Sequence, residues 1–193
     1  MSKNLYIIAG CNGAGKTTAS FTILPEILNC FEFVNADEIA RGLSPFNPEN
    51  VAIEAGKIML KRIDELFKSN VDFAFETTLS SKVYRNKLIA AQKNNYKVTL
   101  LFFWLENVEL AIDRVQVRVA KGGHNIPIET IRRRYKTGIK NLFDIYLALC
   151  DKVVIIDSSN SKYEPIARGN KGEQFSIINN DKWGQIKRSN NEA

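Results

Sequence analysis

The stretch Gly10-Cys-Asn-Gly-Ala-Gly-Lys-Thr17 decides the expected fold of this chain. It fits the pattern G-x-x-x-x-G-K-[ST], in which a glycine-rich loop turns its backbone N–H groups inward around phosphate oxygens. An apolar run at residues 5–9 precedes it and a helical segment at residues 18–28 follows. The N-terminus of that helix adds partial positive charge. This strand–loop–helix context favours a nucleotide phosphate site over an incidental glycine-rich turn.

The residues of this loop have separate expected tasks. Lys16 is expected to lie on an exposed loop and to reach the β- and γ-phosphates, whereas the Thr17 hydroxyl is expected to ligate Mg²⁺. Arg114, far along the chain, is assigned to the same nucleotide. The expected nucleotide-binding set is Gly10, Asn12, Gly13, Ala14, Gly15, Lys16, Thr17, Thr18 and Arg114.

Outside the loop, short apolar runs recur between helical patterns. They are nearly continuous rather than alternating, which is typical of strands buried on both faces of a parallel sheet. Helical patterns begin at Pro48 and Pro127, and another is expected to start at an Asn107 cap and to stop at Gly122. Strands that alternate with helices predict an α/β fold. The five runs are residues 5–9, 31–34, 71–75, 98–105 and 153–156.

The end of the chain has a different character. The sequence after Asp157 is polar, and residues 163–167 and 174–178 predict a C-terminal β-hairpin within about residues 161–180. Residues from 189 onward are expected to fray. The length of 193 residues, without an internal repeat, predicts one domain over residues 1–193.

Composition narrows the class of protein. An apolar share of 45% and a charged share of 25% are typical of a folded globular chain. The longest apolar run, residues 98–105, is far shorter than the ~20 residues of a membrane span, so we expect no membrane association and a cytoplasmic location. Three separated cysteines and a single histidine argue against a disulfide framework or a zinc site.

Two carboxylates follow predicted strands, where functional residues gather in a parallel sheet. Asp37 can accept a proton from a substrate hydroxyl, or it can simply cap the helix that starts near Glu38. Glu76 can hold a substrate hydroxyl or a water molecule of Mg²⁺, or it can be a helix-cap acid. The expected substrate-binding set is Glu76, Thr77, Thr78 and Arg41, and the expected metal set is Thr17 and Glu76.

Positive charge is concentrated in one segment. Residues 114–140 hold eight cations against one anion, a charge of +7, while the whole chain carries +6. Such a block suits a compact polyphosphate, and no nucleic-acid partner is expected. The loop at residues 122–127 joins two arginine-bearing helices, as in a phosphate-closing lid at about residues 114–136. The alternative is an ordinary solvated basic face, and the role of His124 stays open.

Taken together, these motifs resemble the zeta-toxin family of P-loop kinases over about residues 4–157. The resemblance implies phosphorylation of a small molecule by ATP or GTP, with a sugar hydroxyl of UDP-N-acetylglucosamine as the acceptor. It implies Asp37 as the base, Glu76 as a substrate contact and a small antitoxin protein as a partner. It also implies that the transferred phosphoryl group is stabilised by Lys16, Arg118 and Arg134. The motifs that carry it are the phosphate loop, Asn35-Ala-Asp37, Phe75-Glu-Thr-Thr78 and the segment Arg114…Arg118…Gly122-Gly-His-Asn-Ile-Pro127…Arg134-Tyr135.

The sequence therefore predicts an α/β fold of the P-loop NTPase or kinase type. We expect a mainly parallel five-stranded sheet between helices, an arginine-bearing helical lid and a C-terminal β-hairpin. The expected function is that of a Mg²⁺- and ATP-dependent small-molecule kinase. Two alternatives stay open: a nucleoside or nucleotide kinase, and a nucleotide-dependent binding module with slow hydrolysis.

Overall fold

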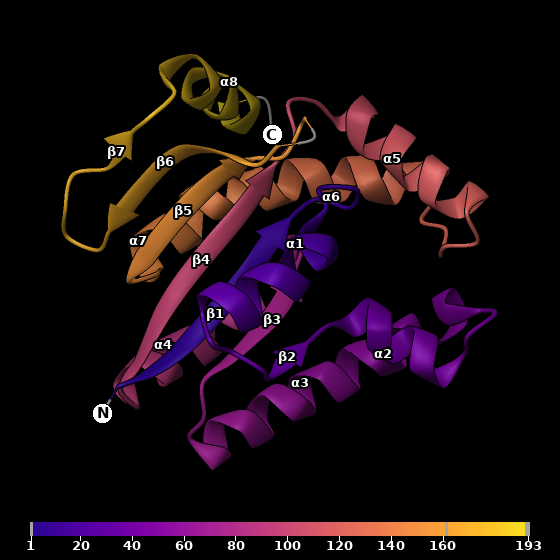
Figure 1. Ribbon diagram of the computed structural model, residues 1–193, viewed down its shortest axis with the longest axis horizontal. Coiled ribbons are helices and arrows are strands. Elements are labelled where there is room, and N and C mark those ends of the chain that lie inside the picture. Colours follow the sequence, from indigo (N-terminus) through magenta and orange to yellow (C-terminus); the bar gives the residue numbers. More distant parts are fainter. Residues whose placement is uncertain (1, 161, 192–193) are drawn as a thin grey trace.

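The computed structural model describes residues 2–160 and 162–191 and is built on one seven-stranded sheet (Figure 1). The strand order is β2-β3-β1-β4-β5-β6-β7. The first five strands are parallel, and β6 and β7 are antiparallel to their neighbours. Their bounds are β1 Lys3–Gly10, β2 Phe33–Val34, β3 Phe73–Thr77, β4 Tyr96–Trp104, β5 Lys152–Asp157, β6 Glu164–Asn170 and β7 Ser176–Ile177.

The expected α/β fold with five parallel strands and a C-terminal hairpin is confirmed. The hairpin pairs with β5 and extends the same sheet, which therefore has seven strands rather than five. Residue 161, at the expected start of the hairpin, lies outside the described residues.

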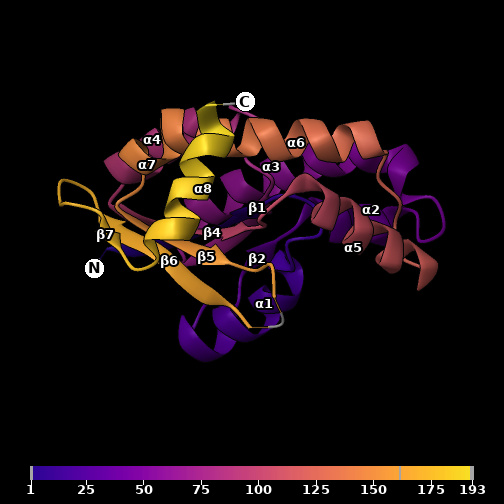
Figure 2. The same cartoon turned by 90° about the horizontal axis from the view of Figure 1, so that it is seen from above.

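The core follows the apolar runs of the sequence. β1 lies between β3 and β4 in the sheet, and its residues Leu5, Ile7 and Ile8 are fully buried. Successive side chains of a strand point to opposite faces, so this run buries both faces of the sheet. Figure 2 shows α4 (Tyr84–Lys93), α6 (Ile128–Asn141) and α8 (Asn180–Asn191) on one side of the sheet and α1 (Lys16–Thr22) on the other.

The remaining helices complete the layers and form an arm beside the sheet. α2 and α3 pack against each other next to β2, at one edge of the sheet (Figure 1). α5 leads from β4 into the expected lid loop. The bounds are η1 Ile23–Ile27, α2 Ala36–Leu43, η2 Pro48–Val51, α3 Ala52–Ser69, α5 Val108–Ala120, η3 Leu142–Tyr146 and α7 Leu147–Leu149.

Several local signals act as the sequence predicts. The Asn107 Oδ1 accepts a hydrogen bond from the Leu110 N–H at 2.8 Å and so caps α5. α5 ends at Ala120, and Gly122 follows with a φ of 82°, which a residue with a side chain rarely adopts. None of the helices within residues 2–160 and 162–191 combines the length and apolar character needed to cross a bilayer.

The C-terminal segment differs from the expectation. Residues 189–191 belong to α8 and are not frayed, and residues 192–193 lie outside the described part of the chain. The reason is tertiary: the ring of Trp183 stacks on Phe175 from the hairpin with 5.6 Å between centroids, and Lys182 pairs with the buried Asp157. These contacts stabilise a helix whose own sequence is mostly polar.

Candidate active site

The phosphate loop connects β1 to α1, and its glycines are required by close packing. Gly10 has a φ of 137°, and a Cβ there would lie 2.2 Å from the Phe103 carbonyl oxygen of β4. Gly13 has a φ of 81°, and its Cβ would lie 2.7 Å from the Ala111 carbonyl oxygen of α5. Only glycine fits such positions, so the loop is held between β4 and α5.

Behind the loop, Lys16 and Thr17 converge on Glu76 from β3. The Thr17 hydroxyl donates to Glu76 Oε2 at 2.8 Å, and the Lys16 Nζ lies 3.4 Å from Glu76 Oε1. Lys16 also donates to the Cys11 carbonyl at 2.9 Å. The expectation that Lys16 is exposed is wrong: its side chain is only 6% exposed, because α1 carries it against the end of the sheet.

Asn35 is a member of this cluster to which the sequence analysis assigned no role of its own. Its Nδ2 donates to Glu76 Oε2 at 3.0 Å, while its Oδ1 accepts the Asp37 N–H at 2.8 Å and caps α2. The alternative that Asp37 is the cap is therefore wrong. Glu76 lies within β3, and the next helix begins only at Tyr84, so the helix-cap alternative for Glu76 is wrong too. The signal for Asn35 was its place directly after β2, where an N-cap is expected.

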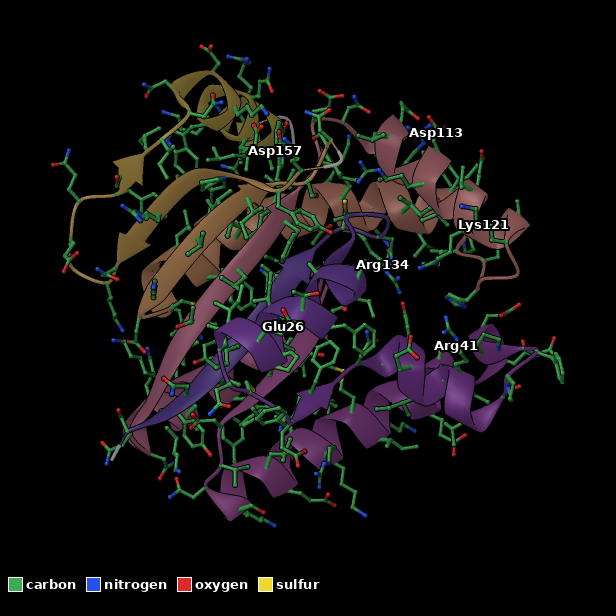
Figure 3. The ribbon with its side chains drawn as sticks, in the orientation of Figure 1. Glu26, Arg41, Asp113, Lys121, Arg134 and Asp157 are labelled. Atoms are coloured by element: carbon green, nitrogen blue, oxygen red, sulfur yellow. The ribbon has the colours of Figure 1, made fainter. Side chains whose placement is uncertain are left out.

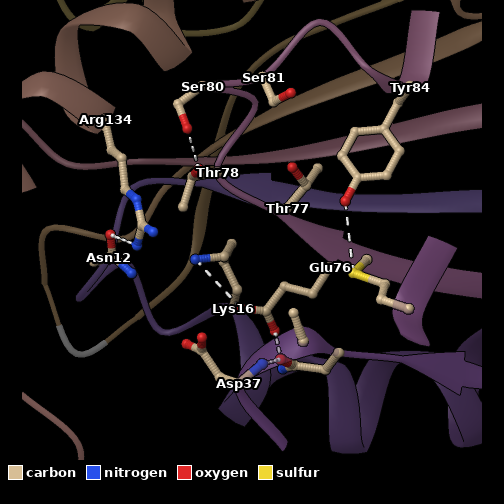
Figure 4. A pocket seen from close by; sticks show the side chains of 13 residues that line it. Asn12, Lys16, Asp37, Glu76, Thr77, Thr78, Ser80, Ser81, Tyr84 and Arg134 are labelled. Atoms are coloured by element: carbon tan, nitrogen blue, oxygen red, sulfur yellow. Dashed lines mark hydrogen bonds and ion pairs between the residues drawn. The ribbon is translucent and has the colours of Figure 1, made fainter. Parts of the chain in front are cut away.

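A pocket of about 190 Å³ opens over this cluster (Figure 4). It gathers residues from β3, the phosphate loop, α2 with its N-cap, α3, the β3–α4 connection, α4 and α6. The expected site residues among its lining are Asn12, Lys16, Asp37, Glu76, Thr77, Thr78 and Arg134. The lining residues to which the sequence analysis assigned no role are Asn35, Ala36, Met59, Ser80, Ser81 and Tyr84.

Asp37 and Arg134 enter the pocket from different elements. In Figure 4, Arg134 reaches in from α6 and Asp37 from α2, with Lys16 between them. The Arg134 Nη1 donates to Asn12 Oδ1 at 3.1 Å. Burial lowers the pKa of Arg134, and the negative charge of Asp37 acts in the opposite direction. Asp37 itself is exposed, so an incoming ligand can reach its carboxylate.

The other expected cations lie outside the pocket lining. Arg114 clamps backbone: its guanidinium donates to the carbonyls of Ser158 and Ser159, both at 2.7 Å, and to Gly13 at 3.4 Å. Arg118 donates to the His124 carbonyl at 2.9 Å, within its own loop. Arg41 forms an exposed pair with Glu38 at 3.4 Å, and Thr18 is exposed on α1.

The hydroxyl-rich wall of the pocket is the main feature that the sequence analysis missed. Ser80 and Ser81 follow Thr78 in the β3–α4 connection, and the Thr78 and Ser80 hydroxyls lie 2.8 Å apart. The run Thr77-Thr-Leu-Ser-Ser81, directly after a buried strand, was the signal that could have found them. The wall faces Asp37 and Lys16 across the pocket in Figure 4.

A family model and one curated protein are similar to this chain in sequence. The sequence model of the Zeta toxin family matches residues 1–181. An uncharacterized protein of Haemophilus influenzae is 28% identical over 141 residues, which are 70% of this chain and 94% of that protein.

Solved structures share the fold at low identity. The AvrRxo1-ORF1:AvrRxo1-ORF2 complex with sulphate ions matches at a TM-score of 0.75 and 16% identity, over 96% of this chain and only 63% of that chain. The PezAT toxin–antitoxin system of Streptococcus pneumoniae matches at 0.63 and 16% identity, over the whole of this chain and 87% of that one. With a family match over nearly its full length, the chain belongs to the Zeta toxin family.

Proposed function

We propose that this protein is a Mg²⁺- and ATP-dependent kinase that transfers the γ-phosphoryl group to a hydroxyl of a small-molecule acceptor. The observation that carries the proposal is the convergence of Lys16, Thr17 and Glu76 on one side of a pocket that also exposes the carboxylate of Asp37. A phosphate-binding loop alone would fit many nucleotide-binding proteins. A carboxylate free to face an acceptor hydroxyl points to transfer.

The phosphate side of the pocket fits a magnesium–nucleotide complex. The Thr17 hydroxyl and the Glu76 carboxylate are oxygen donors that already meet at 2.8 Å, and such ligands suit a hard cation. Thr17 would hold Mg²⁺ directly, and Glu76 directly or through water. Bound there, Mg²⁺ neutralises negative charge on the β- and γ-phosphates. Lys16 would contact the same oxygens, and either ATP or GTP fits a loop that contacts only phosphates.

On the acceptor side, Asp37 is the proposed base. It takes the proton of the acceptor hydroxyl as that oxygen bonds to the γ-phosphorus and the bond to the β-phosphate bridging oxygen breaks, releasing ADP. Arg134 stabilises the charge on the phosphoryl group in flight, because its guanidinium lies in the same pocket beside Asn12. Arg118 is proposed to join it when the lid closes, and Thr77, Thr78 and Arg41 to bind the acceptor.

The family resemblance extends the proposal to the acceptor and to a partner. We propose a sugar hydroxyl of a UDP-N-acetyl sugar as the acceptor and a small antitoxin protein as the partner. Support for a partner comes from the similar structures, which are described as a toxin–antitoxin system and as an ORF1:ORF2 complex. A cytoplasmic location is part of the proposal, because ATP is the phosphoryl donor.

The test is a mass-spectrometric screen of acceptors. The protein, Mg²⁺ and ATP are incubated with sugar nucleotides, nucleosides, nucleotides and small polyols, each beside an Asp37→Asn reaction. The expected result is a phosphate-sized mass gain on a sugar nucleotide, with ADP formed in equal amount and no gain with Asp37→Asn. A gain only on nucleosides would change the acceptor class. Slow ADP formation with no acceptor modified, equal in both proteins, would contradict the kinase and indicate a binding module.

A further inference from the structure

Tyr84 lines the pocket with a buried hydroxyl group, and the proposed reaction assigns this group no role. It is the first residue of α4, and its ring stacks on Phe75 of β3 with 4.7 Å between centroids and a 29° interplanar angle. The residue is only 9% exposed. Stacking and burial fix the ring, so the hydroxyl has one defined position in the pocket wall.

Among the described residues, the proton of this hydroxyl has no strong acceptor. The hydroxyl oxygen lies 3.5 Å from the thioether sulfur of Met59, and sulfur is a weak acceptor. In Figure 4 the ring extends from the upper wall and its hydroxyl points across the pocket, near Thr77 and Glu76. Burial raises the pKa of Tyr84, and a hydrogen bond from the Thr77 hydroxyl to the Tyr84 oxygen acts the other way. The group keeps its proton at neutral pH and can donate it.

The β3–α4 connection, which leads to Tyr84, is held by hydrogen bonds from α6 and η3. Leu79 has a φ of 56°, which is unfavourable for a residue with a side chain, and its carbonyl accepts a hydrogen bond from the buried Asn141 Nδ2 at 2.6 Å. The Tyr146 hydroxyl donates to the Ser81 carbonyl at 3.2 Å. A strained loop held in this way presents preorganised groups to a ligand.

The two sides of this wall differ in chemistry. The Tyr84 ring and Met59 are apolar, whereas Ser80 and Ser81 present hydroxyls. A ligand that matches both has a carbon skeleton with more than one oxygen. The volume of about 190 Å³ admits only a small ring or a short chain, so the pocket takes the reacting end of the acceptor.

We infer that Tyr84 is an acceptor-binding residue whose hydroxyl donates a hydrogen bond to a second oxygen of the acceptor, next to the hydroxyl that faces Asp37. The inference rests on the proposed kinase function. Its consequence is regioselectivity, because holding a second oxygen fixes which hydroxyl reaches the γ-phosphate. The Tyr84 ring and the Met59 thioether pack against the carbon skeleton of the same group.

The experiment compares Tyr84→Phe with the wild type, using the acceptor that gains phosphate in the screen. Tyr84→Phe keeps the ring and its stacking on Phe75 and removes only the hydroxyl. The KM for the acceptor is expected to rise about three- to tenfold, the value of one neutral hydrogen bond. Affinity for a non-hydrolysable ATP analogue and the melting temperature should not change. Tyr96→Phe is the matched control, because the buried Tyr96 hydroxyl bonds the Val71 carbonyl at 3.1 Å, outside this pocket.

Deoxy analogues of the acceptor provide a second readout that a merely structural role would not move. The wild type should discriminate against the analogue that lacks the second oxygen, and Tyr84→Phe should treat that analogue and the parent acceptor alike. An unchanged acceptor KM in Tyr84→Phe, or equal discrimination by both proteins against every analogue, would overturn the inference while the kinase stands. If the wild type phosphorylates no acceptor, both the kinase proposal and the Tyr84 inference are overturned. The wild-type reaction alone shows that outcome, so it is distinct from a failure of the inference.

Discussion

One arginine lies in the pocket and another lies near the tip of the lid, and the two side chains make different hydrogen bonds. Arg134, on α6, reaches into the pocket and bonds Asn12, whereas Arg118, on α5, bonds the His124 carbonyl of its own loop. Figure 3 shows Arg134 directed toward the centre of the molecule and Lys121 at the outer end of α5. Both arginines fit the same sequence pattern, so the pattern alone does not say where a long side chain ends.

The difference follows from what each helix packs against. α6 lies close to the pocket wall: a Cβ on its Gly138 would lie 2.5 Å from the Thr78 carbonyl oxygen. The end of α5 instead packs on its own loop, where a Cβ on Gly123 would lie 2.6 Å from Arg118 Cγ. The loop also approaches the α2–α3 arm, with His124 Nδ1 3.8 Å from Glu49 Oε2. Arg134 therefore already lies in the pocket, whereas Arg118 has to break its hydrogen bond to the His124 carbonyl before it can contact a phosphate.

The largest effect is expected on the pocket side, for Asp37→Asn. Loss of a general base lowers phosphoryl transfer by about 10²- to 10⁴-fold. The melting temperature should hold, because Asn35 and not Asp37 caps α2. Steady-state turnover at several Mg²⁺ concentrations is the measurement. If excess Mg²⁺ restored the rate, Asp37 would be a metal-binding residue instead.

Arg134→Ala should have the next largest effect and directly tests the pocket half of the comparison. Removing one group that stabilises transition-state charge lowers kcat by about 10²- to 10³-fold, with a smaller change in nucleotide affinity. Arg133→Ala is the control, since its side chain is exposed one position away on the same helix. A larger defect at Arg133 than at Arg134 would contradict this assignment.

Arg118→Ala should lower turnover less, by about tenfold. To reach the phosphoryl group, the guanidinium must first break its 2.9 Å hydrogen bond to the His124 carbonyl. A hydrogen bond to a charged group contributes about 1.5 kcal/mol, so breaking it makes the net contribution of Arg118 about tenfold smaller than that of Arg134. Turnover and nucleotide affinity of Arg118→Ala and Arg134→Ala, measured side by side, check this. A defect as large as that of Arg134→Ala would show that the lid tip acts on the phosphoryl group as strongly as the pocket does.

The smallest effect on turnover is expected for Asp157→Asn, at the end of β5 beside the loop that Arg114 contacts. Asp157 accepts from the Ser159 N–H at 2.9 Å and pairs with Lys182, so it fixes the loop that Arg114 clamps. Loss of the pair should destabilise the fold by about 2 kcal/mol, or about 4–8 °C in melting temperature, with turnover nearly unchanged.

The pH dependence of this effect has a defined sign. Burial alone would raise the pKa of Asp157, but the hydrogen bonds from Lys182 and Ser159 outweigh it, and the net pKa lies below the usual 3.8. A depressed carboxyl pKa stabilises the fold above the unfolded-state value and stops doing so as pH falls through the folded-state value. Thermal melts of the wild type and Asp157→Asn should therefore differ at pH 7 and converge in strong acid. An equal difference at both would contradict the ion-pair account.

The sequence was sufficient for the parts of the molecule that local patterns determine. The strand–loop–helix around Lys16 and the parallel strands both follow from periodicity and glycine placement. The bounds of the strands shifted by up to two residues, apart from the C-terminal end of β6, which lies three residues later than expected. The two-residue β2 starts at Phe33 rather than at residue 31.

What the sequence could not show depends on tertiary contacts. The burial of Lys16 depends on Glu76, which is 60 positions later in the numbering, and the Tyr84 hydroxyl became a pocket feature only through α3 and β3. α8 was missed because its polar sequence shows little helical periodicity. The helix is stabilised instead by the tertiary contact between Trp183 and Phe175. The position of the Arg118 guanidinium depends on the close packing of Gly123 against the Arg118 side chain, which a helical pattern in the sequence does not predict.

The central claim is that the loop at residues 10–17 binds the phosphates of ATP through Lys16, and calorimetric titration of Lys16→Met with Mg²⁺–ATP tests it most directly. Methionine keeps most of the buried side-chain volume, and Glu76 retains its bonds from Thr17 and Asn35, so the fold should survive. The expected result is a cooperative thermal transition with nucleotide affinity weakened at least tenfold and no phosphoryl transfer. Wild-type affinity and turnover in a folded Lys16→Met protein would contradict the claim.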